Sequence, residues 1–353
     1  MKVRLADVAV RAGVSEATVS RVLNDKPGVS QATRDKVRSV LDVLGYDDRF
    51  LPPAAAGLVG VVVPELSNPV FAALSLVVQT HLARAGYTPV VCSLVPGGVH
   101  EADFVRVLVQ QKAAGVVFLS GVHANTEADA KPYVDMLRRG LPAVFVNGRM
   151  DGVDAPFVST DDAVAVDLAV EHLVGLGHER IGLAMGPPRY VPSLRKTAAF
   201  HDAVRRHLAG VVPAGEVDSL VMYTQFRVDG GESAARALLD RGATAIVCGS
   251  DLMALGAVGA ARARGLRVPE DVSVVGCDDS PLLDFTDPPL TTVHQDVEAV
   301  GTAAARALLA ELKGEHPLRG ELLVRPHLVV RGSTAAAPAP RAPVARPRRA
   351  RTR

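Results

Sequence analysis

Seven apolar runs recur along most of this chain and leave little choice of fold for it. They are LVGVVV (58–63), TPVVCS (88–93), GVVFL (115–119), PAVFVN (142–147), RIGLAM (180–185), TAIVCG (244–249) and VSVVGC (272–277). None alternates with polar residues, and helical stretches separate them, which is typical of parallel strands buried on both faces. The runs are too many for one small sheet, so we expect an α/β fold with two lobes.

The length and charge of the chain are consistent with such a core and limit its partners. With 353 residues, 48% of them hydrophobic, the chain exceeds one ordinary domain. The formal net charge is only +1, so any affinity for DNA must come from locally placed charge. Ligands of parallel sheets bind beyond the carboxyl ends of the strands, which is where binding residues are expected.

Residues 1–48 differ from the rest and indicate three short helices. The first has one apolar face, made of Leu5, Val8, Ala9 and Ala12. Ser15 is a good N-cap for a second helix that runs to about Asn24. After a break at 27–28, Ser30 caps a third helix with an inner face made of Val37, Val40, Leu41 and Leu44. We therefore expect a small helical head with its own core.

Two stretches of different composition flank the large core. The segment DDRFLPPAAAG (47–57) contains two adjacent prolines that cannot continue a helix, so we expect a linker. The segment 333–353, STAAAPAPRAPVARPRRARTR, holds six arginines, no acidic residue and no large apolar residue except Val344. We expect it to be a disordered basic tail, able to neutralise phosphates without reading sequence.

Other classes of protein are disfavoured by missing signals. Cys92, Cys248 and Cys277 are far apart, which fits buried thiols in a reducing compartment and argues against a disulfide framework or a zinc site. No signal peptide and no apolar run of about 18 residues is found, so we expect a cytoplasmic protein without membrane contact. The phosphate-loop, dinucleotide, nucleophile-elbow and zinc-protease motifs are absent. We expect no catalytic residue, no cofactor, no metal and no turnover.

Several longer motifs in fixed order resemble the lac repressor (LacI/GalR) family over roughly residues 3–332. RLADVAVRAGVSEATVSRVLN (4–24), VSQATRDKV (29–37) and LGY (44–46) resemble its head. VPELSNPVF (63–71), AVEHLVGLGHERIG (169–182), SDLMALGA (250–257), GLRVPEDVSVVGCDD (265–279) and PPLTTVHQD (288–296) resemble its core. The resemblance implies a helix-turn-helix head, a two-lobed periplasmic-binding-protein-like core, a homodimer on double-stranded operator DNA, and repression controlled by a small effector.

The same resemblance divides the chain into parts. We expect a DNA-binding domain at 1–48, a hinge at 49–57, an effector-binding and dimerisation domain at 58–332, and the tail at 333–353. The N-lobe would hold about 58–160 and 291–320, and the C-lobe about 161–290 and 321–332. The family's hinge helix places a leucine in the minor groove, but this linker is shorter and holds two prolines. Leu51 is one candidate wedge, and we expect Leu58 to begin the first strand instead.

Base contacts are expected from the second helix, because such a helix enters the major groove. By resemblance Glu16, Ala17 and Arg21 hold the base-reading positions, and their side chains suit cytosine, thymine and guanine respectively. Thr18, Asn24 and Thr33 suit phosphate contacts. The alternative for Glu16 and Arg21 is a solvated helix face. The expected DNA-binding residues are Ser15, Glu16, Ala17, Thr18, Ser20, Arg21, Asn24 and Thr33.

The resemblance places an effector pocket between the lobes. Asp278 falls on the family's carboxylate for ligand hydroxyls, and Phe226 falls on an aromatic that stacks on the ligand. The family's arginine falls on Lys196, with Arg195 adjacent. The other matched positions are Asn68, Phe71, Asn147 and Ser250.

These residue types favour a sugar, because polar groups suit its hydroxyl rim and a phenylalanine suits its apolar face. A purine effector is the main alternative. The two phenylalanines could instead be plain core, and of Asp278 and Asp279 we expect one to cap a helix and one to face the cleft. We expect His172 and His178 to be structural. A solute-binding protein would share the two-lobed core, but the missing signal peptide and the head argue against it. A sugar-acting enzyme is disfavoured by the absent catalytic motifs.

Overall fold

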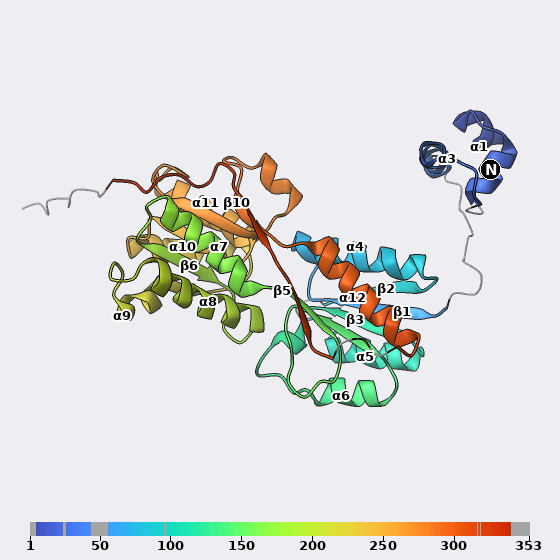
Figure 1. The fold of residues 1–353 in the computed structure, drawn as a ribbon, viewed down its shortest axis with the longest axis horizontal. Helices are drawn as coiled ribbons and strands as arrows, with labels where there is room; N and C mark the ends of the chain where they lie inside the picture. The colour runs from blue at the N-terminus through green and yellow to red at the C-terminus, as the bar shows by residue number, and fades with distance from the viewer. Residues whose placement is uncertain are drawn as a thin grey trace, which may run out of the picture. The chain divides into compact units, whose positions relative to one another are not determined.

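The computed structural model describes residues 5–23, 26–43, 56–94, 97–315, 317 and 319–339, and the chain divides into one unit up to Ala54 and one from Ala55. The first unit has three helices, α1 (Leu5–Ala12), α2 (Glu16–Leu23) and α3 (Gln31–Val43) (Figure 1). Their core is made of Val8, Ala9, Ala12, Val19, Val22, Val37 and Leu41. The predicted three-helix head is confirmed, while Asn24 and Leu44 lie outside the described residues.

The start of α2 follows the predicted capping. Gly13 ends α1 with a φ of 64°, a left-handed conformation that suits glycine. Ser15 Oγ then accepts a 3.1 Å hydrogen bond from the Thr18 N–H. This cap fixes where α2 begins, and therefore which of its side chains face away from the core.

The first lobe of the second unit is a six-stranded parallel sheet in the order β11-β5-β4-β3-β1-β2. Its strands are β1 (Leu58–Val63), β2 (Thr88–Ser93), β3 (Gly115–Leu119), β4 (Ala143–Val146), β5 (Phe157–Thr160) and β11 (Glu321–Val324). Its helices are α4 (Pro69–Arg84), α5 (Glu101–Gln110), α6 (Lys131–Arg138) and α12 (Val297–Leu312), with a 3-10 turn η1 (Val122–Ala124). Two apolar clusters, one on each face of the sheet, form the core.

The second lobe repeats this plan with the strand order β12-β10-β9-β8-β6-β7. Its strands are β6 (Ile181–Met185), β7 (Val221–Tyr223), β8 (Ala245–Cys248), β9 (Ser273–Asp278), β10 (Thr291–His294) and β12 (His327–Val329), the last antiparallel to β10. Its helices are α7 (Asp162–Gly175), α8 (Val191–His207), α9 (Ala214–Val217), α10 (Val228–Asp240) and α11 (Asp251–Ala263), with 3-10 turns η2 (Asp218–Leu220) and η3 (Pro281–Phe285). The two-lobed α/β fold predicted from the apolar runs is confirmed.

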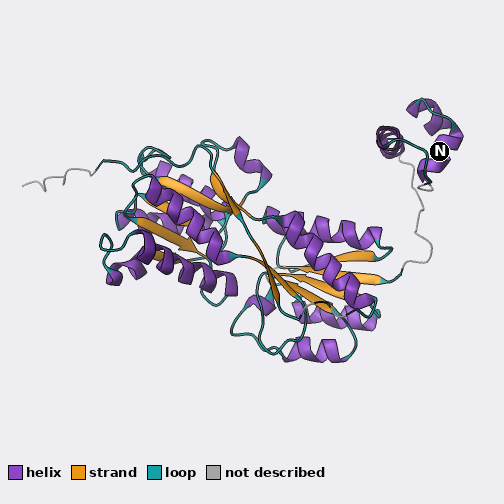
Figure 2. Ribbon diagram, viewed as in Figure 1, coloured by secondary structure: helices purple, strands orange, loops and turns teal. Residues whose placement is uncertain are grey.

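The chain passes between the lobes at three places, which corrects the expected lobe boundaries. The crossovers follow β5, follow β10 and lie between β11 and β12 (Figure 2). Residues 291–294 pair with β9 and therefore belong to the second lobe, whereas residues 321–324 pair with β5 and belong to the first. The expected assignment of 291–294 and 321–324 is therefore wrong by one strand at each end, because strand pairing rather than chain order decides membership.

The beginning of the expected tail is part of the second lobe. Ser333 is fully buried, and its Oγ accepts from the Thr291 N–H at 2.8 Å and donates to the Val274 carbonyl at 2.6 Å. The prediction of disorder is thus wrong for this segment, because small polar residues there complete the hydrogen bonds of β9 and β10. His172 contacts Thr334 and His178 contacts Ala335, which confirms their structural role. Residues 340–353 lie outside the described residues.

In the described residues, no helix is long and apolar enough to cross a membrane. The three cysteines are buried free thiols, as expected from their positions in strands.

Candidate functional site

A cleft of about 400 Å³ lies between the two lobes of the second unit. One wall comes from residues that follow β1, β3 and β4, and the other from residues that follow β6, β7, β8 and β9. The cleft therefore occupies the carboxyl ends of parallel strands in both sheets, where ligands of such folds bind. Its volume is in the range of small-molecule sites.

The structure brings together seven of the eight residues expected to bind the effector. Those that line the cleft are Asn68, Phe71, Asn147, Lys196, Phe226, Ser250 and Asp278. Arg195 is not among them, because its guanidinium binds Glu321 instead. The expectation for Arg195 is therefore corrected, and its neighbour Lys196 carries the positive charge on this wall.

Asp278 ends β9 with one carboxylate oxygen paired and the other unpaired. Oδ1 accepts a 2.5 Å hydrogen bond from Gln295 Nε2, whereas Oδ2 is buried and has no hydrogen-bond partner in the described part of the chain. Burial, and then the nearby Asp251 carboxylate, raise the pKa of Asp278. An unpaired buried oxygen costs about 1–3 kcal/mol, and a ligand hydroxyl at this wall would satisfy it.

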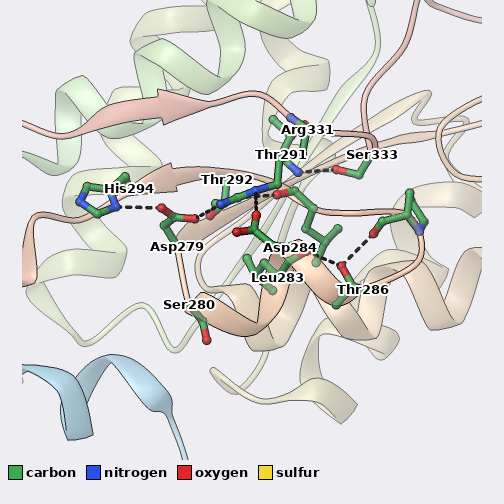
Figure 3. Close-up of polar contacts among 12 residues, drawn as sticks. Asp279, Ser280, Leu283, Asp284, Thr286, Thr291, Thr292, His294, Arg331 and Ser333 are labelled. Atoms are coloured by element: carbon green, nitrogen blue, oxygen red, sulfur yellow. Dashed lines mark hydrogen bonds and ion pairs between the residues drawn. The ribbon is translucent and has the colours of Figure 1, made fainter.

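Asp279 turns away from the cleft and anchors the turn that carries Asp278. Its Oδ2 lies 2.9 Å from His294 Nδ1, and its Oδ1 accepts from Arg331 Nη2 at 2.7 Å (Figure 3). Arg331 also pairs with Asp284 of η3. Asp279 therefore belongs to an ion-pair cluster that joins β10, the segment after β12 and η3. It caps no helix, so the expectation that one aspartate of the pair would be a cap is wrong.

Lys196 and Asp162 form a buried ion pair on the cleft wall. Lys196 Nζ lies 2.8 Å from Asp162 Oδ1, and both residues are almost fully buried. Burial alone would lower the pKa of Lys196, but the Asp162 carboxylate outweighs it and the pKa is raised. Burial raises the pKa of Asp162, and Lys196 opposes that shift. The ammonium is therefore fixed in place as a charged donor beside Asp278.

The Phe226 ring lies against the ends of β6 and β8. A Cβ atom added at Gly186 would lie 2.0 Å from the ring, and one at Gly249 would lie 3.0 Å from it. The absence of side chains at these two glycines therefore makes room for the ring. Phe71 and Tyr190 also line the cleft, and all three aromatics are half-buried rather than plain core.

Three of the polar residues combine a local structural role with a place on the cleft wall. Asn68 caps α4 through its Oδ1, which accepts from the Val70 N–H at 3.3 Å. Ser250 caps α11 in the same way, through the Met253 N–H at 3.3 Å. Asn147 directly follows β4 and has a φ of 67°, which asparagine tolerates better than most residues. Each cap uses an acceptor oxygen, so the donor hydrogens of Asn68 and Ser250 remain for a ligand.

Sequence reasoning missed other residues of the cleft. They include Glu65, Asp162, Tyr190, Gln225, Arg227 and Gln295. Asp162 and Gln295 follow β5 and β10, two strands that were not predicted because FVST and TTVH are short and partly polar. Had those strands been recognised, the rule that ligands meet strand ends would have identified both residues.

The predicted base-reading residues lie on the outer face of α2. Glu16, Ala17 and Arg21 are exposed, whereas Val19 and Val22 are buried against the other two helices. No ion pair joins Glu16 and Arg21 within the described residues of the head. Ser20 and Thr18 are half-buried, the Thr18 hydroxyl bonds to Ser15, and the Thr33 hydroxyl bonds to Ser30. Asn24 lies outside the described residues.

Comparisons with known proteins agree with both halves of this description. The pattern of bacterial regulatory proteins of the lacI family matches residues 4–48, and that of a periplasmic binding protein-like domain matches residues 170–334. The HTH-type transcriptional regulator MalR of Streptomyces coelicolor is 52% identical over 342 residues, covering 97% of this chain and 99% of MalR. A transcriptional regulator CelR–cellobiose complex matches with 34% identity and a TM-score of 0.70, covering 94% of this chain and 99% of CelR. The Lac repressor dimer bound to operator and the anti-inducer ONPF matches with 28% identity and a TM-score of 0.67, covering 95% of this chain and 100% of the repressor.

Proposed function

Because this chain belongs to the lacI family of bacterial transcriptional regulators, we propose that it is a repressor controlled by a neutral sugar-like effector. The homodimer would read double-stranded operator DNA through the exposed face of α2. The cleft between the lobes would hold the effector and perform no chemistry on it. The observation that carries the effector class is the unpaired, buried Oδ2 of Asp278 on the cleft wall.

The chemistry of the cleft supports a neutral polyhydroxy ligand. Its charged residues are Lys196 and Arg227 against Glu65, Asp162 and Asp278. The wall therefore has no excess of positive charge, and a phosphate or carboxylate group would gain little there. Hydroxyl groups can both donate to the carboxylates and accept from Lys196, and the Phe226 ring suits the apolar face of a sugar.

The relatives support the same assignment. The CelR structure contains cellobiose, and the Lac repressor structure is a dimer on its operator. A purine would use the aromatic residues Phe71, Tyr190 and Phe226 but has fewer hydroxyl groups for the polar wall. We therefore place the purine second.

Control of DNA binding would follow from differential binding to the lobes. A ligand that contacts both lobes favours the lobe arrangement in which its contacts are better. The first lobe connects directly to the head, so that arrangement would influence how two heads meet two half-sites. The coupling is reciprocal, because a ligand that weakens operator binding must itself bind more weakly to the operator-bound protein.

Two linked experiments test this function. Genome-wide capture of bound DNA would supply the operator, and calorimetry on the whole chain would compare neutral mono- and disaccharides with a sugar phosphate and with purine bases. We expect a neutral sugar to bind and to change operator affinity in a fluorescence titration. If a purine base binds and no sugar does, the proposed effector class is wrong. If no operator is captured, the proposal that the protein regulates transcription is wrong.

A further inference from the structure

Arg195 and Glu321 form an ion pair that joins the two lobes. Arg195 lies on α8 of the second lobe, and Glu321 begins β11 of the first. The two parallel contacts are 2.7 Å from Nη1 to Oε1 and 2.6 Å from Nη2 to Oε2. The side chains are 33% and 11% exposed, so the pair is only partly screened by water. Such a two-pronged pair fixes the relative orientation of its partners as well as their distance.

Hydrogen bonds connect this pair to the first-lobe wall of the cleft, and the chain itself connects it to the second-lobe wall. Glu321 Oε1 also accepts from Ser159 Oγ at 2.6 Å, and Ser159 Oγ accepts from the Gly148 N–H at 3.1 Å. Gly148 directly follows Asn147 of the first-lobe wall. On the other side, Arg195 directly precedes Lys196 of the second-lobe wall. The Arg195–Glu321 pair therefore lies only a few bonds from Asn147 on one wall and from Lys196 on the other. Both of these residues still line the cleft.

A second contact joins the lobes away from the crossovers. The N–H and the hydroxyl of Thr126 both donate to the Arg189 carbonyl, at 2.8 and 3.0 Å. Asn125 and Tyr190 form an isolated antiparallel bridge beside it. Residues 125–126 follow η1 in the first lobe and residues 189–190 precede α8 in the second. These bonds exist only when the lobes are in the arrangement described here, which makes the Thr126 amide a reporter of that arrangement.

The pair differs from its neighbours on the same helix. Arg206, also on α8, pairs with Asp167 of α7 at 3.0 Å and so remains within the second lobe.

Burial by itself would raise the pKa of Glu321, but Arg195 and Ser159 outweigh it and the pKa is lowered. Glu321 is therefore charged when paired, and removing Arg195 would leave a carboxylate buried without its cation.

We propose that Arg195 and Glu321 act as a clamp that holds the lobes together in the absence of any ligand. The clamp sets the population of the closed arrangement, and loss of either partner shifts the lobes toward opening. The consequence for regulation rests on the proposed function: an effector that bridges the lobes meets walls that are already close, and less of its binding energy is needed to bring them together.

Hydrogen–deuterium exchange on the whole, ligand-free protein tests the clamp. In Arg195→Met and in Glu321→Gln we expect the Thr126 amide to exchange several-fold faster than in the parent, while amides inside β3 and β8 keep the parent's rate. The double variant should exchange no faster than the single variants, because both act on one interaction. Arg206→Met is the matched control and should behave as the parent does.

An unchanged Thr126 rate in Arg195→Met, or an equal increase in Arg206→Met, would overturn the clamp. If Arg195→Met does not fold, Arg195→Lys takes its place, because lysine retains the charge but lacks the two parallel N–H donors of the guanidinium. An exchange rate of the Thr126 amide between those of the parent and an opened protein is then expected. A parental rate in Arg195→Lys counts against the clamp. Neither effector nor operator is present in this assay. Its failure is therefore distinct from a failure of the proposed function, which the calorimetry and DNA titration test.

Discussion

Asp278 and Gln295 are joined by a 2.5 Å hydrogen bond from the Gln295 amide nitrogen to the Asp278 carboxylate. The amide oxygen of Gln295 accepts in turn from Thr160 Oγ1 at 2.9 Å. Thr160 and Gln295 lie at two of the three crossovers between the lobes. A ligand that bonds to the other oxygen of Asp278 would therefore contact a residue that is hydrogen-bonded to one crossover and linked through Gln295 to another.

Asp278→Ala should weaken the response to effector without loss of folding. Ligand hydroxyls would lose a carboxyl acceptor, which is worth about 1–3 kcal/mol, so the effector concentration for half-response should rise about fivefold or more. The measurement is a pair of operator titrations, with and without effector, for variant and parent. Glu232→Ala, at a partly exposed site on α10, is the control. A parental effector response would contradict the site, and failure to fold would mean that Asp278 is structural.

Arg21→Ala should remove discrimination at one base pair of each half-site. Loss of a bidentate guanine contact costs about 1–3 kcal/mol on the matched operator and little on an operator changed at that base. Titration against matched and single-base-changed operators measures the difference. Arg11 of α1, which is also exposed, provides the control Arg11→Ala. A variant of Arg21 that still discriminates as the parent does would show that this residue is not a reader.

The sequence alone located seven of the twelve strands in the described residues and part of the cleft, and the reasons for its errors are physical. Strands such as GVVFL are apolar throughout because both faces are buried, and that pattern is visible locally. The membership of β10 and β11 depends on pairing with strands that are distant in the chain, which no local pattern encodes. Adjacent residues on α8 point in different directions, so the sequence could not separate Lys196, which faces the cleft, from Arg195, which faces Glu321.

Asp251 should make a contribution to stability that is lost as pH rises from about 4 to 7. Asp251 accepts from the Ser280 N–H and from the Thr292 hydroxyl at 2.7 Å each, and burial raises its pKa from 3.8 to about 7, with Asp279 adding to the shift and Arg331 opposing it. The native state therefore retains a proton that the unfolded chain releases. The contribution of Asp251 to the free energy of unfolding therefore decreases through this window, by up to about 1.4 kcal/mol per pH unit.

Asp251→Asn should reduce that slope, because its side chain has no proton to lose. Chemical denaturation at pH 4.5, 6 and 7.5 on variant and parent measures it. Asp240, an exposed residue whose pKa is lowered by Arg264, provides the control Asp240→Asn, which should keep the parental slope in this window. An identical slope for Asp251→Asn and the parent would exclude Asp251 as the source.

The C-terminal arginines should contribute to DNA affinity but not to its specificity. Deletion of 340–353 removes all six, and each phosphate contact that is lost should reduce the slope of log K against log salt by about 0.9. Operator preference should persist. Deletion from 333 should in addition destabilise the second lobe, because it removes the buried Ser333 and its bonds to β9 and β10. An unchanged salt slope after the shorter deletion would mean that the arginines do not contact DNA.

We expect the exposed apolar residues of η3 to form part of the interface of the proposed homodimer. Phe285 is 87% exposed and Leu282 is 68% exposed, although the Arg331–Asp284 ion pair anchors the turn that carries them. Large apolar side chains exposed side by side often mark a protein–protein interface. We expect Phe285→Glu to weaken self-association in sedimentation experiments and to lower operator affinity, since one head meets only one half-site. Val211→Glu, at an exposed apolar site elsewhere on the second lobe, should leave the dimer intact. A Phe285→Glu protein that remains dimeric at the parent's concentration would place the interface elsewhere. A stable tetramer of the parent would contradict the expectation of a dimer, which the absence of any leucine after residue 333 supports.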